Sequence, residues 1–266
     1  MKRVVLGCLV LTLQAAELKV DHVTLAGLDL RKMQKDLAAV GLPSEYGGKH
    51  PNRATEMAIV SFTDGSYIEL IAKQPDADPK SFAEHAWAKF IQENAGPCAW
   101  AVRPDNLAAE VDRLRATGAA VGDITLGGRT RPDGVRLEWE TAQPRGDRGG
   151  FFPFLIHDMT PHENRVYPSG KPNAPQYTGI TKVVIAVKDL DRAIAKYRNA
   201  YNLRAPRREM DARLGARTAS FDGTPVVLAT PASNQNWMAE RVAKYGDLPC
   251  EFVIQNSKTG EMKWIR

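Results

Sequence analysis

His22 and Glu69 are the two residues whose types and positions best suit chemistry. His22 lies in an alternating run, where a β-strand would place it on one face with Val20 and Thr24. Glu69 lies in a second short β-type run and would share a face with Tyr67. An imidazole and a carboxylate together can bind a divalent cation such as Zn²⁺, Mn²⁺, Fe²⁺ or Ni²⁺.

The same pair also has simpler interpretations. A histidine in a sheet is usually satisfied by hydrogen bonds, and a buried carboxylate is usually paired with a basic residue. A buried His–Glu pair could also serve as acid–base groups without metal, because burial and neighbouring charges tune both pKa values. His50, in the loop before the third expected strand, could supply a third ligand or contact a substrate.

Other side chains could line a cavity beside this pair. The aromatic candidates for its wall are Tyr67, Trp100, Phe152 and Phe154. The candidates for contact with an anionic substrate are Arg129, Arg131 and Arg136. The simpler interpretation places the aromatic residues in the core and the arginines in solvent. His157 and His162 are interpreted as surface residues.

The elements that would position these residues form a repeated pattern. An alternating strand over residues 18–25 is followed by an amphipathic helix over 29–41 that ends at a glycine. Two further strands are expected at 56–62 and 67–72, with a short edge strand at 44–46. The first unit therefore predicts the order strand, helix and three strands.

The pattern then recurs along the chain. The second unit is expected as a strand at 98–103, a helix at 105–118 and strands at 120–125, 135–140 and 151–157, after a linking helix at 82–93. The third is expected as a strand at 180–187, a helix at 190–200, strands at 213–221 and 225–229, and a helix at 237–245. Residues 249–254 repeat the opening of the second unit, which indicates a fourth unit that is begun and cut short.

Prolines concentrate in residues 161–176, which predicts a linker there. The expected organisation is a two-module domain over 18–160 and, after the linker, a third module with the start of a fourth over 177–266. The mixture of strands and helices predicts the α+β class, with helices covering the sheets.

Several segments resemble glyoxalase-like members of the vicinal oxygen chelate superfamily. VDHVTLAGLDL, YGGKHPNRATEMAIVSF and DGSYIELIA resemble the first module of such proteins. GPCAWAV, RTRPDGVRLEWE and FFPFLI resemble the second module, and GITKVVIAVKDLDRAIAKYRNAYNL resembles the opening of another. The resemblance covers most of residues 18–256. It implies repeated βαβββ modules, with curled mixed sheets around a cavity and helices outside.

The resemblance also implies a chemistry. Metal-dependent members hold a divalent ion with His or Gln from an opening strand and Glu from a closing strand. The ion chelates adjacent oxygens of a substrate in isomerase, lyase, epimerase or dioxygenase reactions. His22 and Glu69 stand at such positions and would be both metal ligands and catalytic residues. Other members, of the bleomycin-resistance type, bind small molecules without metal.

This sequence departs from the full ligand set. The second module has Cys98 or Ala99 at the position of the histidine and Phe154 at that of the glutamate. The third module has Lys182 and Leu228 there. A metal-dependent enzyme of lyase, isomerase or dioxygenase type is the first hypothesis. A metal-free binding protein is the alternative, and a catalytically silent scaffold is a weaker one.

Composition and the N-terminus bear on partners and location. The net charge is +5, without a basic tract interleaved with aromatics, which argues against nucleic-acid binding. Lys2 and Arg3 precede a short apolar run and small residues, which predicts a signal peptide over 1–16 and a secreted or periplasmic protein. The run is too short for a membrane span. The segment ending at Cys8 resembles a lipoprotein cleavage box, a less favoured interpretation.

Two questions about assembly stay open in the sequence. Cys98 and Cys250 would be free buried thiols or, in an oxidising compartment, a disulfide. An incomplete fourth module would leave the second half with an open cavity, which a homodimer could fill.

Overall fold

The computed structural model describes residues 18–145 and 150–266, so the expected signal peptide lies outside the described residues. The first module follows the expected order. Its opening strand is buried along its whole length, and Asp29 caps the helix by accepting a hydrogen bond from the backbone N–H of Lys32. The elements are β1 (Val20–Ala26), α1 (Leu30–Ala39), β2 (Glu45–Lys49), β3 (Thr55–Ser61) and β4 (Tyr67–Lys73).

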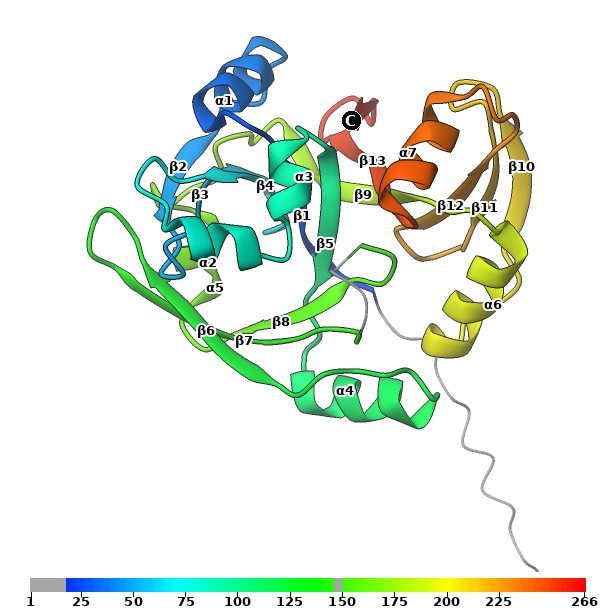
Figure 1. Ribbon diagram of the computed structural model, residues 1–266, viewed down its shortest axis with the longest axis horizontal. Helices are drawn as coiled ribbons and strands as arrows, with labels where there is room; N and C mark the ends of the chain where they lie inside the picture. The colour runs from blue at the N-terminus through cyan, green and yellow to red at the C-terminus, as the bar shows by residue number, and fades with distance from the viewer. Residues whose placement is uncertain (1–17, 146–149) are drawn as a thin grey trace, which may run out of the picture.

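The second module completes one curled sheet with the first. After α2 (Pro79–Glu84) and α3 (Ala88–Gln92) come β5 (Gly96–Val102), α4 (Leu107–Ala116), β6 (Thr125–Thr130), β7 (Arg136–Ala142), β8 (Phe154–Asp158) and the short α5 (His162–Val166). The eight strands run in the order β2-β3-β4-β1-β5-β8-β7-β6, and the helices lie outside the sheet (Figure 1). β1 is parallel to β4 and antiparallel to β5, and β5 is in turn parallel to β8.

The two edges of this sheet approach each other, so the sheet is nearly closed. The guanidinium of Arg129 on β6 donates to the carbonyl of Gly47 on β2. A Cβ added at Gly48 would lie 3.4 Å from the ring of Pro132, which shows how closely the edges pass. This closure encloses the space into which the first strands point their side chains.

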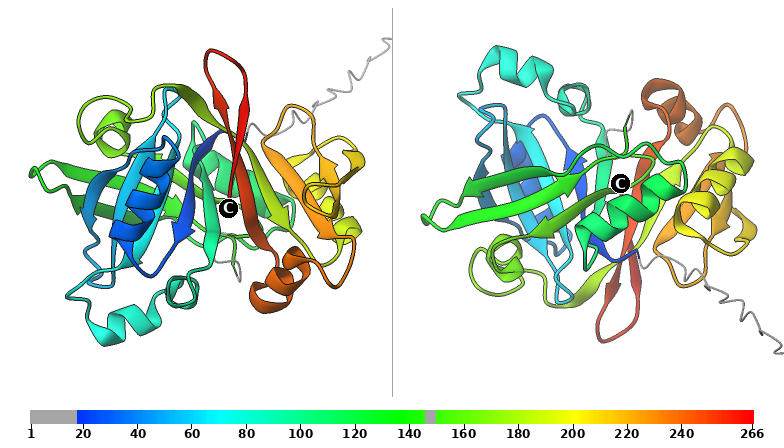
Figure 2. Two further views of the ribbon diagram at one scale, coloured as in Figure 1. Left: turned by 90° about the horizontal axis from the view of Figure 1, so that it is seen from above. Right: turned by 90° about the horizontal axis from the view of Figure 1, so that it is seen from below.

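The third module and the segment expected to begin the fourth build a second sheet beside the first. Their elements are β9 (Tyr177–Ala186), α6 (Leu190–Tyr201), β10 (Arg207–Asp211), β11 (Ala216–Ser220), β12 (Val226–Pro231), α7 (Trp237–Tyr245), β13 (Leu248–Asn256) and β14 (Met262–Ile265). The six strands run in the order β10-β11-β12-β9-β13-β14. Figure 2 shows the two sheets side by side with their helices on the outside. The α+β class and the curled mixed sheets predicted from the sequence are therefore confirmed.

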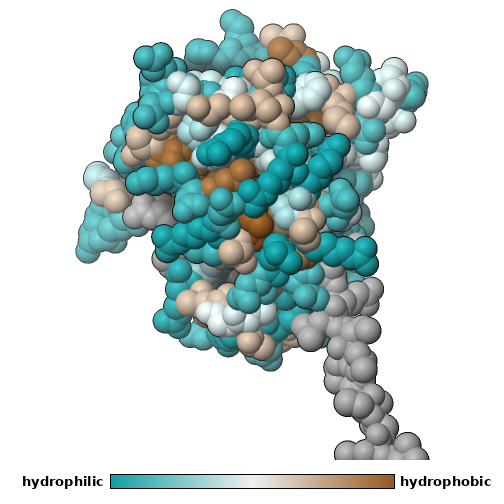
Figure 3. All heavy atoms as spheres, turned by 90° about the vertical axis from the view of Figure 1, so that its right-hand side faces the viewer, coloured by the Kyte–Doolittle hydropathy of each residue, from teal (hydrophilic) through white to brown (hydrophobic). Residues whose placement is uncertain are grey.

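One apolar core joins the two halves. Residues of both sheets, among them Val23, Trp100, Ile185 and Phe252, belong to the same buried cluster. The face of the molecule that carries the second half is mainly hydrophilic, with apolar atoms scattered over it (Figure 3). None of the described helices has the length and apolar character needed to cross a membrane.

Two expected elements differ from the structure. The strand expected at 120–125 is displaced to β6, where Gly127 is close to the ring of Trp139: an added Cβ would lie 2.4 Å from its Nε1. The helix expected at 82–93 is two short helices, because His85 adopts an extended conformation with ψ 133°. That interruption turns His85 and Trp87 toward the interior of the first sheet.

Candidate functional site

The curled first sheet surrounds a cavity of about 300 Å³ that is open to solvent on one side. Its ionisable lining consists of His22, His50, Glu69, His85, Arg129 and Arg165. Its apolar and aromatic lining includes Met57, Tyr67, Trp87, Trp139, Phe154 and Ile156. The ionisable groups come mainly from the first module, whereas β7 and β8 of the second supply an apolar wall.

Two imidazoles approach the two oxygens of one carboxylate. The Nε2 of His22 lies 3.9 Å from Oε2 of Glu69, and the Nε2 of His50 lies 3.8 Å from Oε1. Both distances are longer than hydrogen bonds. Glu69 is held in place by Thr24, whose hydroxyl donates to Oε2 over 3.0 Å. The structure thus brings together the two candidate ligands and His50.

An irregularity in β1 explains how His22 is oriented. The pairing of β1 with β5 shifts register between Val20 and His22, so Asp21 has no partner on β5. Such bulges re-aim side chains next to functional sites. The carboxylate of Asp21, fully buried, lies 2.6 Å from Nδ1 of His22. An ionised carboxylate can only accept, so Nδ1 carries the proton and a neutral His22 has its lone pair at Nε2.

Asp21 belongs to a buried ion-pair network centred on Arg165. The guanidinium donates to both oxygens of Asp21, over 2.9 and 2.8 Å, and to both oxygens of Asp158. It also donates to the hydroxyl of Tyr67 over 2.6 Å. Burial by itself would raise the pKa of Asp21, but the charge of Arg165 and the hydrogen bonds from His22 and Arg165 hold it well below its usual range. The network fixes Asp21 as an ionised acceptor.

Two further histidines are kept neutral by burial. Burial lowers the pKa of His50 to about 4, despite the opposing charge of Glu69. Its Nδ1 lies 2.8 Å from the hydroxyl of Thr55. Burial also lowers the pKa of His85, whose Nδ1 accepts the backbone N–H of Trp87 over 3.2 Å. The neutral His85 therefore carries its proton at Nε2.

The donor types of His22, His50 and Glu69 and the two distances to Glu69 suit a divalent metal ion. The three do not form a group whose ligand atoms all lie within 4.8 Å of one another, so they would have to draw closer together to bind one ion. Two donors on one ion at about 2.1 Å lie roughly 3 Å apart when adjacent and about 4.2 Å when opposite; the observed 3.8 and 3.9 Å fall between. Both histidines have a second partner at Nδ1 and Glu69 has one at Oε2, the arrangement usual for metal ligands. Two histidines and a carboxylate form the set typical of non-haem iron and related ions.

A second cluster has closer ligand atoms but fits a metal less well. Asp21, Asp158 and His162 place one ligand atom each within 4.8 Å of one another. Arg165 already donates to all four carboxylate oxygens, and Arg103 contacts Nε2 of His162. These cations neutralise the carboxylates at the place where a metal ion would act. We therefore assign this cluster a structural role. His162 is half-buried in it rather than a surface residue.

The other candidate residues separate into those at the cavity and those elsewhere. Tyr67 and Phe154 line it, and their rings lie 4.7 and 5.2 Å from that of His22. Trp100 lies in the core, because β5 pairs it with Val23 on the opposite face of the sheet from His22. Arg136 is exposed and pairs with a surface glutamate.

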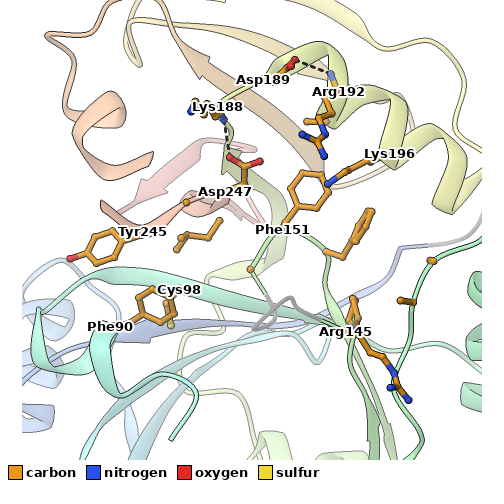
Figure 4. Close-up of a pocket in the computed structure, with 18 of the residues that line it drawn as sticks. Phe90, Cys98, Arg145, Phe151, Lys188, Asp189, Arg192, Lys196, Tyr245 and Asp247 are labelled. Atoms are coloured by element: carbon orange, nitrogen blue, oxygen red, sulfur yellow. Dashed lines mark hydrogen bonds between the residues drawn. The ribbon is translucent and has the colours of Figure 1, made fainter. Parts of the chain in front are cut away.

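Phe152 lies in another place, a cleft of about 900 Å³ between the two halves of the molecule. Figure 4 shows the residues of this cleft, with Lys196 beside the ring of Phe151. Its two carboxylates have structural partners: Asp189 accepts the N–H of Arg192 and Asp247 that of Lys188. The cleft is larger than the cavity of the first sheet, but it lacks the convergent histidines and carboxylate found there.

The second sheet has no equivalent of the His22–Glu69 pair. Lys182 takes the place of His22. The register pairs Thr24 with Glu69 and, at the corresponding positions, Val184 with Val227, so Val227 rather than Leu228 stands in place of the glutamate. The assignment to Leu228 was one residue out, which moves a side chain to the other face of the strand.

Several residues of the site were not identified from the sequence. Asp21 lies beside His22, and strand alternation would have placed it on the opposite face, so only the bulge brings the two together. Arg165 lies in the segment expected to be a linker and reaches the site through α5. His85 lies within the segment that was expected to be one continuous helix over 82–93, so it was not singled out as a cavity residue. An Asp–His dipeptide opening a strand was the one signal available for Asp21.

The comparisons with known proteins agree with this fold. The sequence profile of the family described as a glyoxalase-like domain matches residues 20–201, more than half of the chain, and the chain belongs to this family. No curated protein matches it. A hypothetical protein from Staphylococcus aureus has a TM-score of 0.68 at 12% identity, with 94% of this chain and 99% of that one covered. This likeness is one of fold alone.

Two solved enzymes share the fold at a similarly low sequence identity. A mutant of 4-hydroxymandelate synthase from Streptomyces coelicolor has a TM-score of 0.59 at 11% identity, covering 90% of this chain and 71% of that one. A fusion of a xylose isomerase-like barrel with 4-hydroxyphenylpyruvate dioxygenase has a TM-score of 0.54 at 15% identity, covering 92% of this chain and 37% of that one. Together with the family match, they confirm the fold that the resemblance implied.

Proposed function

We propose that this chain is a divalent-metal enzyme of lyase, isomerase or dioxygenase type that acts on a small molecule with adjacent oxygen atoms. The observation that carries the proposal is the convergence of His22 and His50 on the two oxygens of Glu69, at 3.9 and 3.8 Å. A synthase and a fusion protein that contains a dioxygenase are among the structural neighbours, which supports an enzyme.

The roles of the protein groups follow from their partners. His22, His50 and Glu69 would hold the ion, which when bound would act as a Lewis acid toward the adjacent oxygens of the substrate. Asp21 and Thr55 orient the two imidazoles. His85 carries a proton at Nε2 and can donate it in a hydrogen bond to a substrate bound in the cavity.

Elemental analysis of the purified chain from residue 17 onward tests the proposal. We expect near-stoichiometric Zn, Mn, Fe or Ni in the parent and its loss in His22→Ala/Glu69→Ala. His162→Ala is the matched control, because it removes a histidine of the Arg165 network and should keep the metal. Absence of metal in the parent after incubation with each ion would contradict the proposal.

A metal-free binding protein is the second candidate. It is favoured by the wall of the second module, where Trp139, Phe154 and Ile156 face the cavity and offer no metal ligand. In that case His22 and Glu69 would contact the ligand directly. Turnover that depends on stoichiometric metal would exclude this candidate.

We also propose that the chain is exported, on the basis of the charged and apolar pattern of residues 1–16. The test is to express the full chain in a bacterium and determine the N-terminus of the protein outside the cytoplasm. Processing near residue 16 is expected. A full-length protein retained in the cytoplasm would contradict export, and a lipid on Cys8 would favour the lipoprotein alternative.

A further inference from the structure

Arg129 is a buried cation with an unused hydrogen-bonding group. It lies on the edge strand β6, is 2% exposed, and lines the cavity. Its Nη1 donates to the carbonyl of Gly47, whereas its Nη2 has no hydrogen-bond partner within residues 18–145 and 150–266. A buried donor without a partner costs free energy. The missing acceptor is therefore expected to come from a bound molecule.

The arginines near Arg129 differ from it in that each has a carboxylate partner. Arg131 pairs with Asp133, Arg136 with Glu138, and Arg165 with Asp21 and a second aspartate. Among the described residues, Arg129 makes no such ion pair. Burial lowers its pKa, and the nearby charges of Arg165 and Arg131 act in the same direction, whereas Tyr67 and Glu69 oppose it. A guanidinium stays charged in proteins, so the cavity contains a cation whose charge is not matched by a direct partner.

The other residues that line the cavity indicate which chemical group the bound molecule carries besides its acceptor. Tyr67, Trp87, Trp139 and Phe154 present aromatic rings to the same space. Rings of this kind pack best on flat apolar groups. The cavity holds about 300 Å³, which corresponds to roughly ten atoms of the size of a water molecule.

We propose that Arg129 binds the carboxylate of a small aromatic acid whose ring packs against Trp87, Trp139 and Phe154. This inference rests on the proposed function in that it names the substrate class of the same cavity. It gives Arg129 a substrate-binding role that is separate from the metal ligands. The carboxylate accepts from Nη2, which is the group left free by the chain.

Calorimetric titration with two probes of the same shape tests this assignment. Phenylacetate carries the negative charge and phenylacetamide does not. The protein is the chain from residue 17 onward, treated with EDTA so that no metal contributes. We expect phenylacetate to bind at least about tenfold more tightly than the amide, because the carboxylate forms a charge-assisted hydrogen bond with the guanidinium whereas the neutral amide oxygen forms a weaker one.

Variants decide which arginine is responsible. Arg129→Met should abolish the preference, because it should weaken phenylacetate binding far more than phenylacetamide binding, and the binding of the amide that remains reports that the cavity is intact. Arg136→Met, an exposed arginine on the adjacent strand β7, should keep the preference. Because Arg129 also joins the sheet edges, Arg129→Lys is a second test. Lysine keeps the positive charge but lacks the planar guanidinium with its several N–H donors. The variant should therefore bind phenylacetate several-fold more weakly than the parent.

Equal affinities for the two probes in the parent, no binding of either probe, or a preference that survives Arg129→Met would overturn the assignment. Unchanged phenylacetate binding in Arg129→Lys would count against it as well. These titrations contain no metal. A protein that discriminates the probes but never binds metal would therefore overturn the proposed enzyme and leave this inference standing.

Discussion

Asp21 and Arg165 lie 144 positions apart and form a doubly hydrogen-bonded ion pair, with N–O distances of 2.9 and 2.8 Å. Both side chains are at most 3% exposed. The same guanidinium reaches Asp158 and Tyr67, and Asp21 in turn contacts His22. The pair thus connects α5, which follows the last strand of the first sheet in the sequence, to His22 in the first strand.

Removing Arg165 should strongly destabilise the protein. Arg165→Met would leave two buried aspartates without their cation, and breaking a buried pair in this way costs about 3–5 kcal/mol. Urea unfolding followed by circular dichroism would measure the loss. Arg208→Met is the matched control: its pair with Asp191 is 54% and 78% exposed, and such pairs contribute about 0–1 kcal/mol. Equal effects of the two substitutions would contradict the network.

Asp158 should make the stability depend on acid pH. Burial alone would raise its pKa, but the hydrogen bonds from Arg165 and His162 and the charge of Arg165 lower it overall. A carboxyl with a depressed folded-state pKa stabilises the protein above its unfolded value of about 3.9 and loses that contribution as the pH falls through the folded value. Asp158→Asn should therefore cost stability at pH 7 and progressively less below about pH 4.

Unfolding free energies at pH 7 and at pH 3 to 4 would check this. Asp191→Asn, at an exposed position, should show little change at either pH. A cost of Asp158→Asn that is the same at both pH values would mean that the pair with Arg165 does not carry the effect.

Cys98 and Cys250 should behave as inert thiols in the folded protein. Both are free and buried. Burial raises the pKa of Cys98 well above its ordinary value and that of Cys250 to about 12, although Arg241 opposes both shifts. The reactive form is the thiolate. We expect a disulfide reagent at pH 8 to leave the folded chain from residue 17 onward unmodified and to label both thiols in urea. Thiols that stay unlabelled in urea without reductant would indicate a disulfide.

The fold could be predicted from the sequence because each module repeats a local pattern. Alternation in β1, the aspartate cap of α1 and the apolar β4 are properties of neighbouring residues. The displaced β6 shows the limit. Gly127 and Gly128 are typical of turns, but they form strand because the ring of Trp139 requires a residue without a side chain opposite it.

The site was only partly predictable for the same reason. His22 and Glu69 lie on faces that alternation defines, and the register places them beside one cavity. The orientation of His22 depends on a bulge and on Arg165, and neither leaves a pattern in the sequence. Trp100 shows the converse: its type suggested a cavity wall, but the pairing with Val23 places it in the core. Which face is the interior depends on how the two halves of the sheet close.

Thr55 offers a test of the metal site that leaves every candidate ligand in place. Its hydroxyl contacts Nδ1 of His50 at 2.8 Å, and Thr55→Val keeps the shape but removes this partner. Loss of such an outer contact typically weakens metal binding by about 10- to 100-fold. Titration of the EDTA-treated protein with Zn²⁺ should show that decrease, whereas Thr259→Val, in the exposed turn between β13 and β14, should not. If Thr55→Val binds Zn²⁺ as tightly as the parent, His50 is not a ligand, and the site reduces to His22 and Glu69. Two protein ligands rarely hold a metal ion tightly, so that result would favour the metal-free binding protein.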